Sequence, residues 1–103
     1  MIGRLWSART TAELCGDYVG YFSKQVLEEL RAVPGFVSAE VLTRETGGHV
    51  EILVLTVWQS LAAITAFAGP DRETAVVHPA AKALLTEYDN RVRHFELALL
   101  VTR

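Results

Sequence analysis

Residues 36–58, FVSAEVLTRETGGHVEILVLTVW, decide the fold of this chain. The pair Gly47-Gly48 is a strong turn signal between two extended runs, so the stretch predicts a β-hairpin with strands at 36–45 and 49–58. The centre of the second strand, ILVL at 52–55, is apolar at every position. This pattern is typical of a strand that is buried on both faces. The hairpin therefore predicts a sheet that needs a cover on each side.

Upstream of the hairpin, the pattern predicts another strand at residues 2–9. Alternation along this strand places Arg4, Trp6 and Ala8 on one face. An arginine on a central strand is costly to bury without a partner, so Arg4 is expected to form an ion pair between subunits or to anchor an anionic ligand.

A helix is predicted to follow the first strand. The sequence TTAE at 10–13 fits a capping box, in which Thr10 caps the helix and Glu13 reaches back to it. Apolar residues then recur at helical spacing until Pro34-Gly35 ends the helix. Gly16 and Gly20 lie one turn apart, and we interpret them as a flat strip for close packing.

Three further elements are predicted after the hairpin. Ser60 is placed to cap a short helix that runs through residue 67. A second helical piece begins at Pro79 and continues to about residue 88, because proline suits the first turn of a helix. The last strand is predicted at 92–101.

The order of these elements is strand, helix, strand, strand, helix, strand. This order predicts a single α+β domain over residues 1–103, with a ferredoxin-like βαββαβ arrangement and a four-stranded antiparallel sheet. Two helices cover only one face of such a sheet. A second copy of the chain is the economical cover for the other face, so we expect a homodimer with its sheets packed face to face.

Composition narrows the class of protein. The chain has 103 residues, of which 50% are hydrophobic and 21% charged, and its net charge is −2. This is a large apolar fraction for so small a domain, which supports the homodimer. The slightly acidic balance argues against binding to nucleic acid and against a basic membrane anchor.

The sequence shows no pattern typical of an internal disulfide, a metal site or a signal peptide. The lone Cys15 cannot form an internal disulfide, and no His, Cys or carboxylate set has the spacing of metal ligands. We therefore expect no metal and no bound cofactor. The first residues contain no apolar run of signal-peptide length, so a cytoplasmic location is expected.

Several segments resemble the antibiotic biosynthesis monooxygenase family. They are Trp58-Gln59-Ser60, Phe67-Ala68-Gly69, Ala75-Val76-Val77-His78-Pro79 and Val92-Arg93-His94-Phe95-Glu96. The resemblance implies a dimeric α/β barrel. It also implies kinship with cofactor-free oxygenases, which oxidise electron-rich aromatic compounds such as anthrones and quinols in an apolar pocket.

The residues match the branches of this family unequally. Trp58 corresponds to a tryptophan near the pocket of the cofactor-free oxygenases, but Val54 and Ile64 stand where polyketide-oxidising relatives have a tyrosine and an asparagine. The haem-degrading branch is matched less well. Its first-strand asparagine is missing and Phe67 stands in place of its helix tryptophan, while His78 follows at roughly the right distance to match its axial histidine.

Two histidines are candidates for the catalytic base that would take a proton from a phenolic substrate. They are His94 on the last strand and His78 before the second helix, since imidazole titrates near neutral pH. The alternatives are that His94 is hydrogen-bonded in the dimer core and that His78 lines a loop. Trp58, Phe67, Trp6 and Arg4 are the candidate substrate-binding residues, with core packing as the alternative for the aromatic ones.

The sequence thus predicts a cofactor-independent monooxygenase that oxidises a small aromatic, phenolic or quinol-like compound. One alternative is a non-catalytic, small-molecule-binding or stress-associated protein that uses the same pocket. A haem-degrading monooxygenase is a third, less favoured interpretation.

Overall fold

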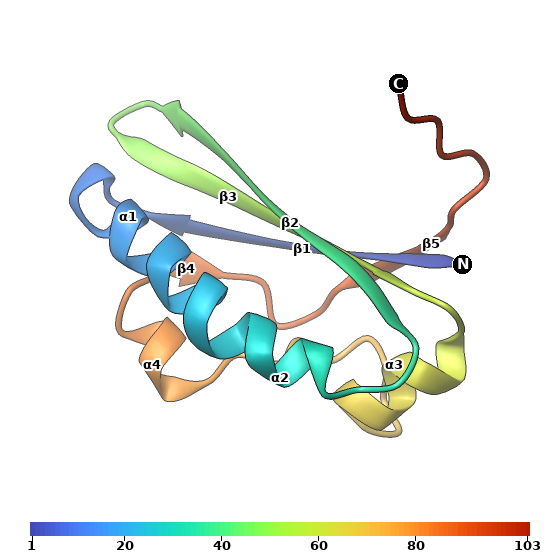
Figure 1. Cartoon of the computed structure of the whole chain (residues 1–103). Coiled ribbons are helices and arrows are strands. Elements are labelled where there is room, and N and C mark those ends of the chain that lie inside the picture. The colour runs from blue at the N-terminus through green and yellow to red at the C-terminus, as the bar shows by residue number, and fades with distance from the viewer.

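The predicted hairpin forms one side of an antiparallel sheet in the computed structural model, which describes residues 1–103 (Figure 1). Strand β2 (Phe36–Thr46) pairs with β3 (His49–Trp58) through the turn at Gly47 and Gly48, both of which adopt positive φ. The other edge of β3 pairs with β1 (Ile2–Thr10). Two short strands, β4 (Glu87–Tyr88) and β5 (Arg93–Glu96), pair with different parts of β1.

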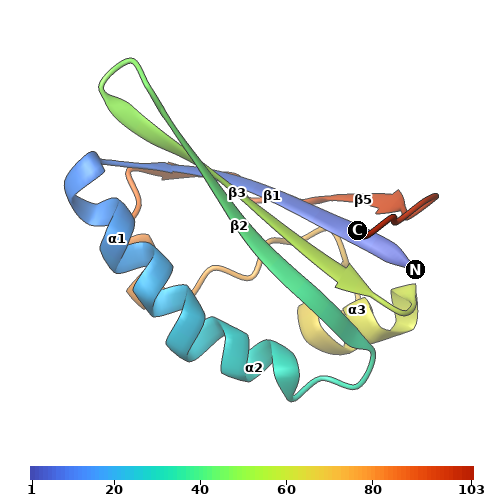
Figure 2. The same ribbon diagram turned by 45° about the horizontal axis from the view of Figure 1, so that its top comes forward.

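All the helices lie on one side of this sheet (Figure 2). The long helical rod between β1 and β2 consists of α1 (Ala12–Tyr21), a π-helical turn η1 (Phe22–Val26) and α2 (Leu27–Arg31). The shorter helices are α3 (Leu61–Ala68) and α4 (Pro79–Lys82). None of these helices has the length and apolarity needed to cross a membrane. The predicted α+β, ferredoxin-like arrangement is therefore confirmed.

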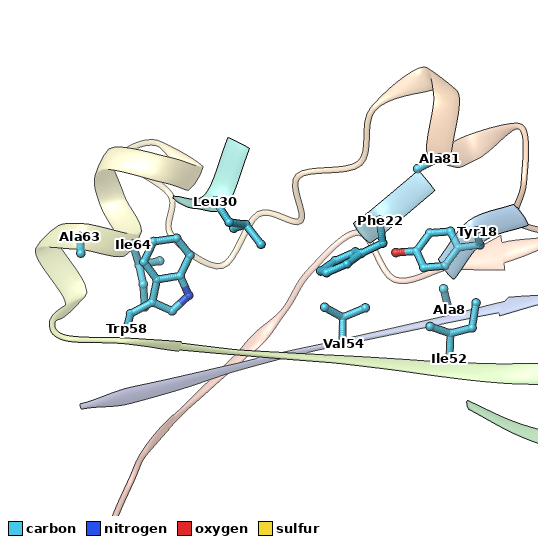
Figure 3. Close-up of a cluster of buried hydrophobic side chains, with 10 residues drawn as sticks. All are labelled: Ala8, Tyr18, Phe22, Leu30, Ile52, Val54, Trp58, Ala63, Ile64 and Ala81. Atoms are coloured by element: carbon cyan, nitrogen blue, oxygen red, sulfur yellow. The ribbon is translucent and has the colours of Figure 1, made fainter. Parts of the chain in front are cut away.

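The core lies between the helices and one face of the sheet (Figure 3). Ile52, Val54 and Trp58 of β3 point into it, while the intervening Leu53 and Leu55 are half-buried on the opposite face. No element of the chain covers that opposite face (Figure 2). The helices of the chain therefore cover one of the two apolar faces of the strand segment 52–55, and the other face is left uncovered.

The helix cap lies one residue later than predicted. Thr11, not Thr10, caps α1, and its hydroxyl accepts the backbone N–H of Leu14. The hydroxyl of Thr10 instead donates to the backbone carbonyl of Leu84. Thr10 is the last residue of β1, and its hydroxyl bonds to the segment that packs beside this strand, so it does not cap the helix.

The second helix and the last strand are both shorter than predicted. Helix α4 ends at Lys82, because the N–H of Thr86 bonds to the carbonyl of Arg9 and draws the chain back to β1. Strand β5 ends at Glu96, which pairs with Ile2 at the start of β1. The N–H of Leu97 still bonds to the carbonyl of Met1. Residues 98–103 run past the start of the chain, and the tail leaves the sheet (Figure 1).

The proposed packing strip on α1 is also wrong. A Cβ atom added at Gly16 or at Gly20 would have nothing within 4 Å apart from its own helix and chain neighbours. The rod packs on the sheet through other residues of the same segment, including Tyr18 and Phe22, which are buried.

Candidate functional site

A cavity lies between the helical rod and the covered face of the sheet. It contains about 630 Å³ of space between protein atoms, part of which is open to solvent. Sixteen residues line it and twelve of them are hydrophobic. Its aromatic lining residues are Trp6, Tyr18, Tyr21, Phe22 and Phe67. A mostly apolar, aromatic cavity with a few polar groups is typical of a site for small organic ligands.

The π-helical turn shapes one wall of the cavity. The N–H of Leu27 bonds to the carbonyl of Phe22, five residues earlier, so the turn holds one residue more than an α-helical turn. The turn lies within the part of the rod that lines the cavity, since Tyr18 before it, Val26 at its end and Glu29 after it are all lining residues. Such π-helical turns occur frequently at functional sites.

Arg4 is the only cationic Lys or Arg side chain in the lining. Its guanidinium donates to the backbone carbonyls of Arg72 and Thr74, and Nη2 lies 2.8 Å from the latter oxygen. The guanidinium carbon is 5.8 Å from the ring centre of Phe67. Burial lowers the pKa of Arg4 to about 10, so the side chain remains charged at neutral pH. These contacts satisfy the buried guanidinium within its own chain, on the helix-covered face.

Thr56 stands beside Arg4, because these two residues are partners in the pairing of β1 with β3. The Thr56 hydroxyl oxygen accepts the indole N–H of Trp58 at 2.9 Å. Trp58 itself is 0% exposed and does not line the cavity. Its ring packs 5.3 Å from that of Phe67, which does line it. Trp58 therefore supports the wall from behind and is not the expected pocket surface.

His78 and Glu29 form a polar pair in the lining. The Nε2 atom of His78 lies 3.1 and 3.0 Å from the two carboxylate oxygens of Glu29. His78 precedes Pro79 at the start of α4, and Glu29 belongs to α2, so the pair joins the two helices beside the cavity. An imidazole held by a carboxylate can accept a proton, because the carboxylate stabilises the imidazolium that forms.

His94 lies behind Arg4 and does not line the cavity. It is the partner of Arg4 in the pairing of β1 with β5, and its Nε2 is 3.0 Å from Nη1 of Arg4. Burial lowers the pKa of His94, and the nearby charge of Arg4 lowers it further. The geometry therefore separates the two candidate bases: His78 reaches the cavity, whereas His94 touches it only through Arg4.

The structure brings four of the predicted site residues into one lining: Arg4, Trp6, Phe67 and His78. Sequence reasoning missed Glu29, which lies 49 positions from His78 and carries no local signal. Tyr18 and Tyr21 also line the cavity and were not among the predicted site residues, although their spacing of three places both on one helix face. No group of three or more His, Cys, Asp or Glu side chains is placed to hold a metal ion.

Comparison with known proteins identifies the family. The sequence model of the antibiotic biosynthesis monooxygenase family matches residues 16–79. The chain belongs to this family. The resemblance noted in the sequence is thereby confirmed. No curated protein sequence matches the chain.

Solved structures of similar fold include a haem degrader and a monooxygenase. The haem degrader MhuD from Mycobacterium tuberculosis, with two haems in its active site, is 22% identical, with a TM-score of 0.62 and coverage of 99% of this chain and 100% of that chain. The ActVA-Orf6 monooxygenase of Streptomyces coelicolor, bound to nanaomycin D, is 18% identical, with a TM-score of 0.57 and coverage of 98% and 92%.

A third similar structure is a candidate antibiotic biosynthesis monooxygenase from Deinococcus radiodurans. It is 13% identical, with a TM-score of 0.63 and coverage of 100% of this chain and 98% of that chain. At these identities the three likenesses establish the fold alone.

Proposed function

We propose that this member of the monooxygenase family binds a small phenolic or quinol-like aromatic compound in the cavity and oxidises it with O₂, without a cofactor. One observation carries the proposal. The apolar, aromatic lining contains a charged Arg4 and, separately, the His78–Glu29 pair. An anion-stabilising cation and a proton acceptor are the two groups that this chemistry requires from the protein.

Proton removal comes first in the proposed reaction. A neutral His78 that donates from Nε2 to Glu29 carries its lone pair on Nδ1, and this atom accepts the substrate proton. The positive charge of Arg4 stabilises the substrate anion in a cavity whose apolar walls limit screening by water.

The substrate anion then supplies the electrons. It transfers one electron to O₂, and the resulting substrate radical and superoxide combine into a peroxide. Loss of water from the peroxide leaves one oxygen atom in the product. For an anthrone, a CH₂ group and O₂ thus become a carbonyl group and H₂O, so atoms and electrons balance.

We also propose that the protein works as a homodimer through the uncovered face of its sheet. Leu42 and Phe95, on the outer strands, are 48% and 51% exposed. Leu53 and Leu55 lie half-buried between these outer strands. A second copy packed on this face removes the apolar surface from water, which favours association.

The haem-degrading interpretation is the second candidate, because His78 lines the cavity and could approach an iron atom there. It ranks second since the Nε2 atom of His78 is engaged by Glu29, and that contact would have to break before Nε2 could bind iron.

Incubation with anthrone under ¹⁸O₂ tests the proposed function. We expect anthraquinone to form faster than in matched buffer and heat-denatured protein controls, with one ¹⁸O atom per product molecule. Binding of anthrone without accelerated oxidation would favour the non-catalytic binding protein. Absence of both binding and turnover would remove the phenolic and quinol-like class of substrate.

A further inference from the structure

Tyr18 has a phenolic hydroxyl that the chain itself does not satisfy. The residue is 3% exposed, in the layer between α1 and the sheet. Its ring is surrounded by those of Trp6, Tyr21 and Phe22, whose centres lie 6.4, 6.2 and 6.4 Å away. None of the side-chain hydrogen bonds of the structure involves the Tyr18 hydroxyl, although buried tyrosines usually find a partner.

The hydrogen bonds of the other buried polar atoms indicate where this hydroxyl lies. Every side-chain nitrogen or oxygen that is sealed from solvent has a hydrogen-bond partner. Because the Tyr18 oxygen has none, it must reach open space, and the open space beside Tyr18 is the cavity that the residue lines. In Figure 3 the ring lies above Ile52 and its oxygen is turned toward the side of Phe22.

The hydroxyl is a hydrogen-bond donor at neutral pH. Burial raises the pKa of Tyr18, with a smaller contribution from Tyr21, so the proton stays on the oxygen. Of its ring neighbours, Trp6 and Phe22 offer no side-chain acceptor toward the cavity, and the hydroxyl of Tyr21 forms no hydrogen bond with it. A ligand that fills this part of the cavity must therefore either supply an acceptor or strand the hydroxyl, which is unfavourable.

We propose that Tyr18 is a specificity-determining residue, whose hydroxyl donates a hydrogen bond to a carbonyl or phenolate oxygen of the bound aromatic compound. This inference rests on the proposed function of the cavity. It extends that function by assigning one oxygen of the ligand to a defined place, at the end of the cavity formed by α1. Arg4 lies two residues along β1 from Trp6, whose ring centre is 6.4 Å from that of Tyr18, and is left to stabilise charge elsewhere on the ligand.

Two probes that differ only at one carbon test this inference. 1-Tetralone carries a carbonyl where tetralin carries a CH₂ group, and neither compound reacts with protein side chains under mild conditions. Dissociation constants for both are measured by titration calorimetry on the wild type and on Tyr18→Phe. The control variant is Tyr88→Phe, which removes a hydroxyl from a half-buried tyrosine outside the cavity lining.

We expect Tyr18→Phe to weaken 1-tetralone binding about 3- to 10-fold, the range for one lost hydrogen bond, and to leave tetralin binding unchanged or tighter. Tyr88→Phe should leave the ratio of the two dissociation constants unchanged. Circular dichroism and thermal melting verify that both variants are folded.

An equal change for both probes in Tyr18→Phe would overturn the inference, since the hydroxyl would then be satisfied by water or would act only through packing. If neither probe binds the wild type, the proposed small-ligand site fails first and the inference falls with it. Binding of tetralone that is insensitive to Tyr18→Phe would overturn the inference alone and leave the proposed function standing.

Discussion

The Nη1 atom of Arg4 lies 3.0 Å from the Nε2 atom of His94, across the pairing of β1 with β5. A guanidinium has donors and no acceptor, so Nη1 donates and Nε2 accepts. His94 must then be neutral, with its proton on Nδ1. Protonation of His94 would replace the acceptor with a second donor and set two cations side by side.

The first prediction concerns the dependence of stability on pH. Burial and the Arg4 charge lower the pKa of His94 below its ordinary value of 6.5, against an opposing effect of Glu73, while Arg72 adds to the lowering. The unfolded chain therefore binds this proton more readily than the folded chain. The stabilising contribution is fully present above about pH 6.5 and is lost as the pH falls through the folded pKa.

Thermal melting between pH 5 and 7.5 measures this contribution. We expect His94→Gln, whose side-chain oxygen can still accept from Arg4, to show a flatter pH dependence of Tm than the wild type. His49→Gln at the hairpin turn is the control for the removal of a histidine. Parallel curves for the wild type and His94→Gln would contradict the assignment.

The second prediction concerns Arg4 as a structural link. Arg4→Met removes the donors for the carbonyls of Arg72 and Thr74, which hold the segment before His78 against β1. We expect a loss of about 1–3 kcal/mol in the free energy of unfolding, the cost of leaving buried polar groups without partners. Urea unfolding at a fixed protein concentration measures it.

The matched control for Arg4 is Arg9→Met on the same strand. Arg9 is exposed, and its nearest contact with Glu87 is 3.8 Å long. We expect this change to cost less than about 0.5 kcal/mol, as is usual for exposed pairs. Equal losses for the two variants would show that the carbonyl contacts of Arg4 contribute nothing to stability.

The hairpin and the sheet were predictable because their signals are local. Gly47 and Gly48 mark the turn, and the alternating pattern of β1 correctly placed Arg4, Trp6 and Ala8 on one face. The ends of the later elements depend on distant partners instead. Strand β5 stops where β1 begins, and no property of residues 97–101 themselves could indicate that limit.

The site was predictable only in part, for the same reason. Family resemblance drew attention to Phe67 and His78, which line the cavity. The partner of His78 comes from another helix, and the exclusion of Trp58 from the lining depends on how Phe67 packs over it. The unsatisfied hydroxyl of Tyr18 is a property of the whole packed layer and has no counterpart in the sequence pattern.

The third prediction compares alanine substitutions at two glycines, one of which would add steric overlap to backbone strain. Gly35 and Gly48 both have positive φ, at 96° and 83°. A Cβ atom at Gly35 would lie 2.6 Å from Cβ of Ala63 in α3, whereas one at Gly48 would meet nothing within 4 Å. We expect Gly48→Ala to cost about 1 kcal/mol from the backbone conformation alone, and Gly35→Ala to cost clearly more. Similar losses in urea unfolding would mean that α3 shifts freely.

The fourth prediction concerns the uncovered sheet face. Leu42→Asp places a charge on that face, at a residue that is 48% exposed in the single chain. If a second copy covers the face, the charge is buried on association and the dimer should dissociate to monomers. Val19→Asp on α1, where the residue is 39% exposed outside the sheet, should leave the dimer intact.

Light scattering coupled to gel filtration distinguishes these states at micromolar concentration. A wild type that is monomeric there would contradict the proposed dimer. A dimer that tolerates Leu42→Asp would place its interface on another surface.

The last prediction assigns the proton transfer. His78 is the only histidine in the cavity lining, and its Nε2 atom is held by Glu29 at 3.0 Å. We expect His78→Gln to lower kcat for anthrone oxidation by roughly 10²–10⁴-fold, the contribution of a general base. Glu29→Gln should cause a smaller loss, because the imidazole remains while the charge that supports its protonated form is removed.

Two controls make this assignment specific. His49→Gln removes a histidine outside the cavity lining and should retain the wild-type rate, and Tm values establish that each variant is folded. Retention of the wild-type rate in His78→Gln would exclude His78 as the base. Stoichiometric haem binding with a Soret band that is lost in His78→Gln would instead identify His78 as an iron ligand. In that case iron would have displaced Glu29 from the Nε2 atom of His78. An imidazole bound to iron would act as a metal ligand and not as the base that takes the substrate proton.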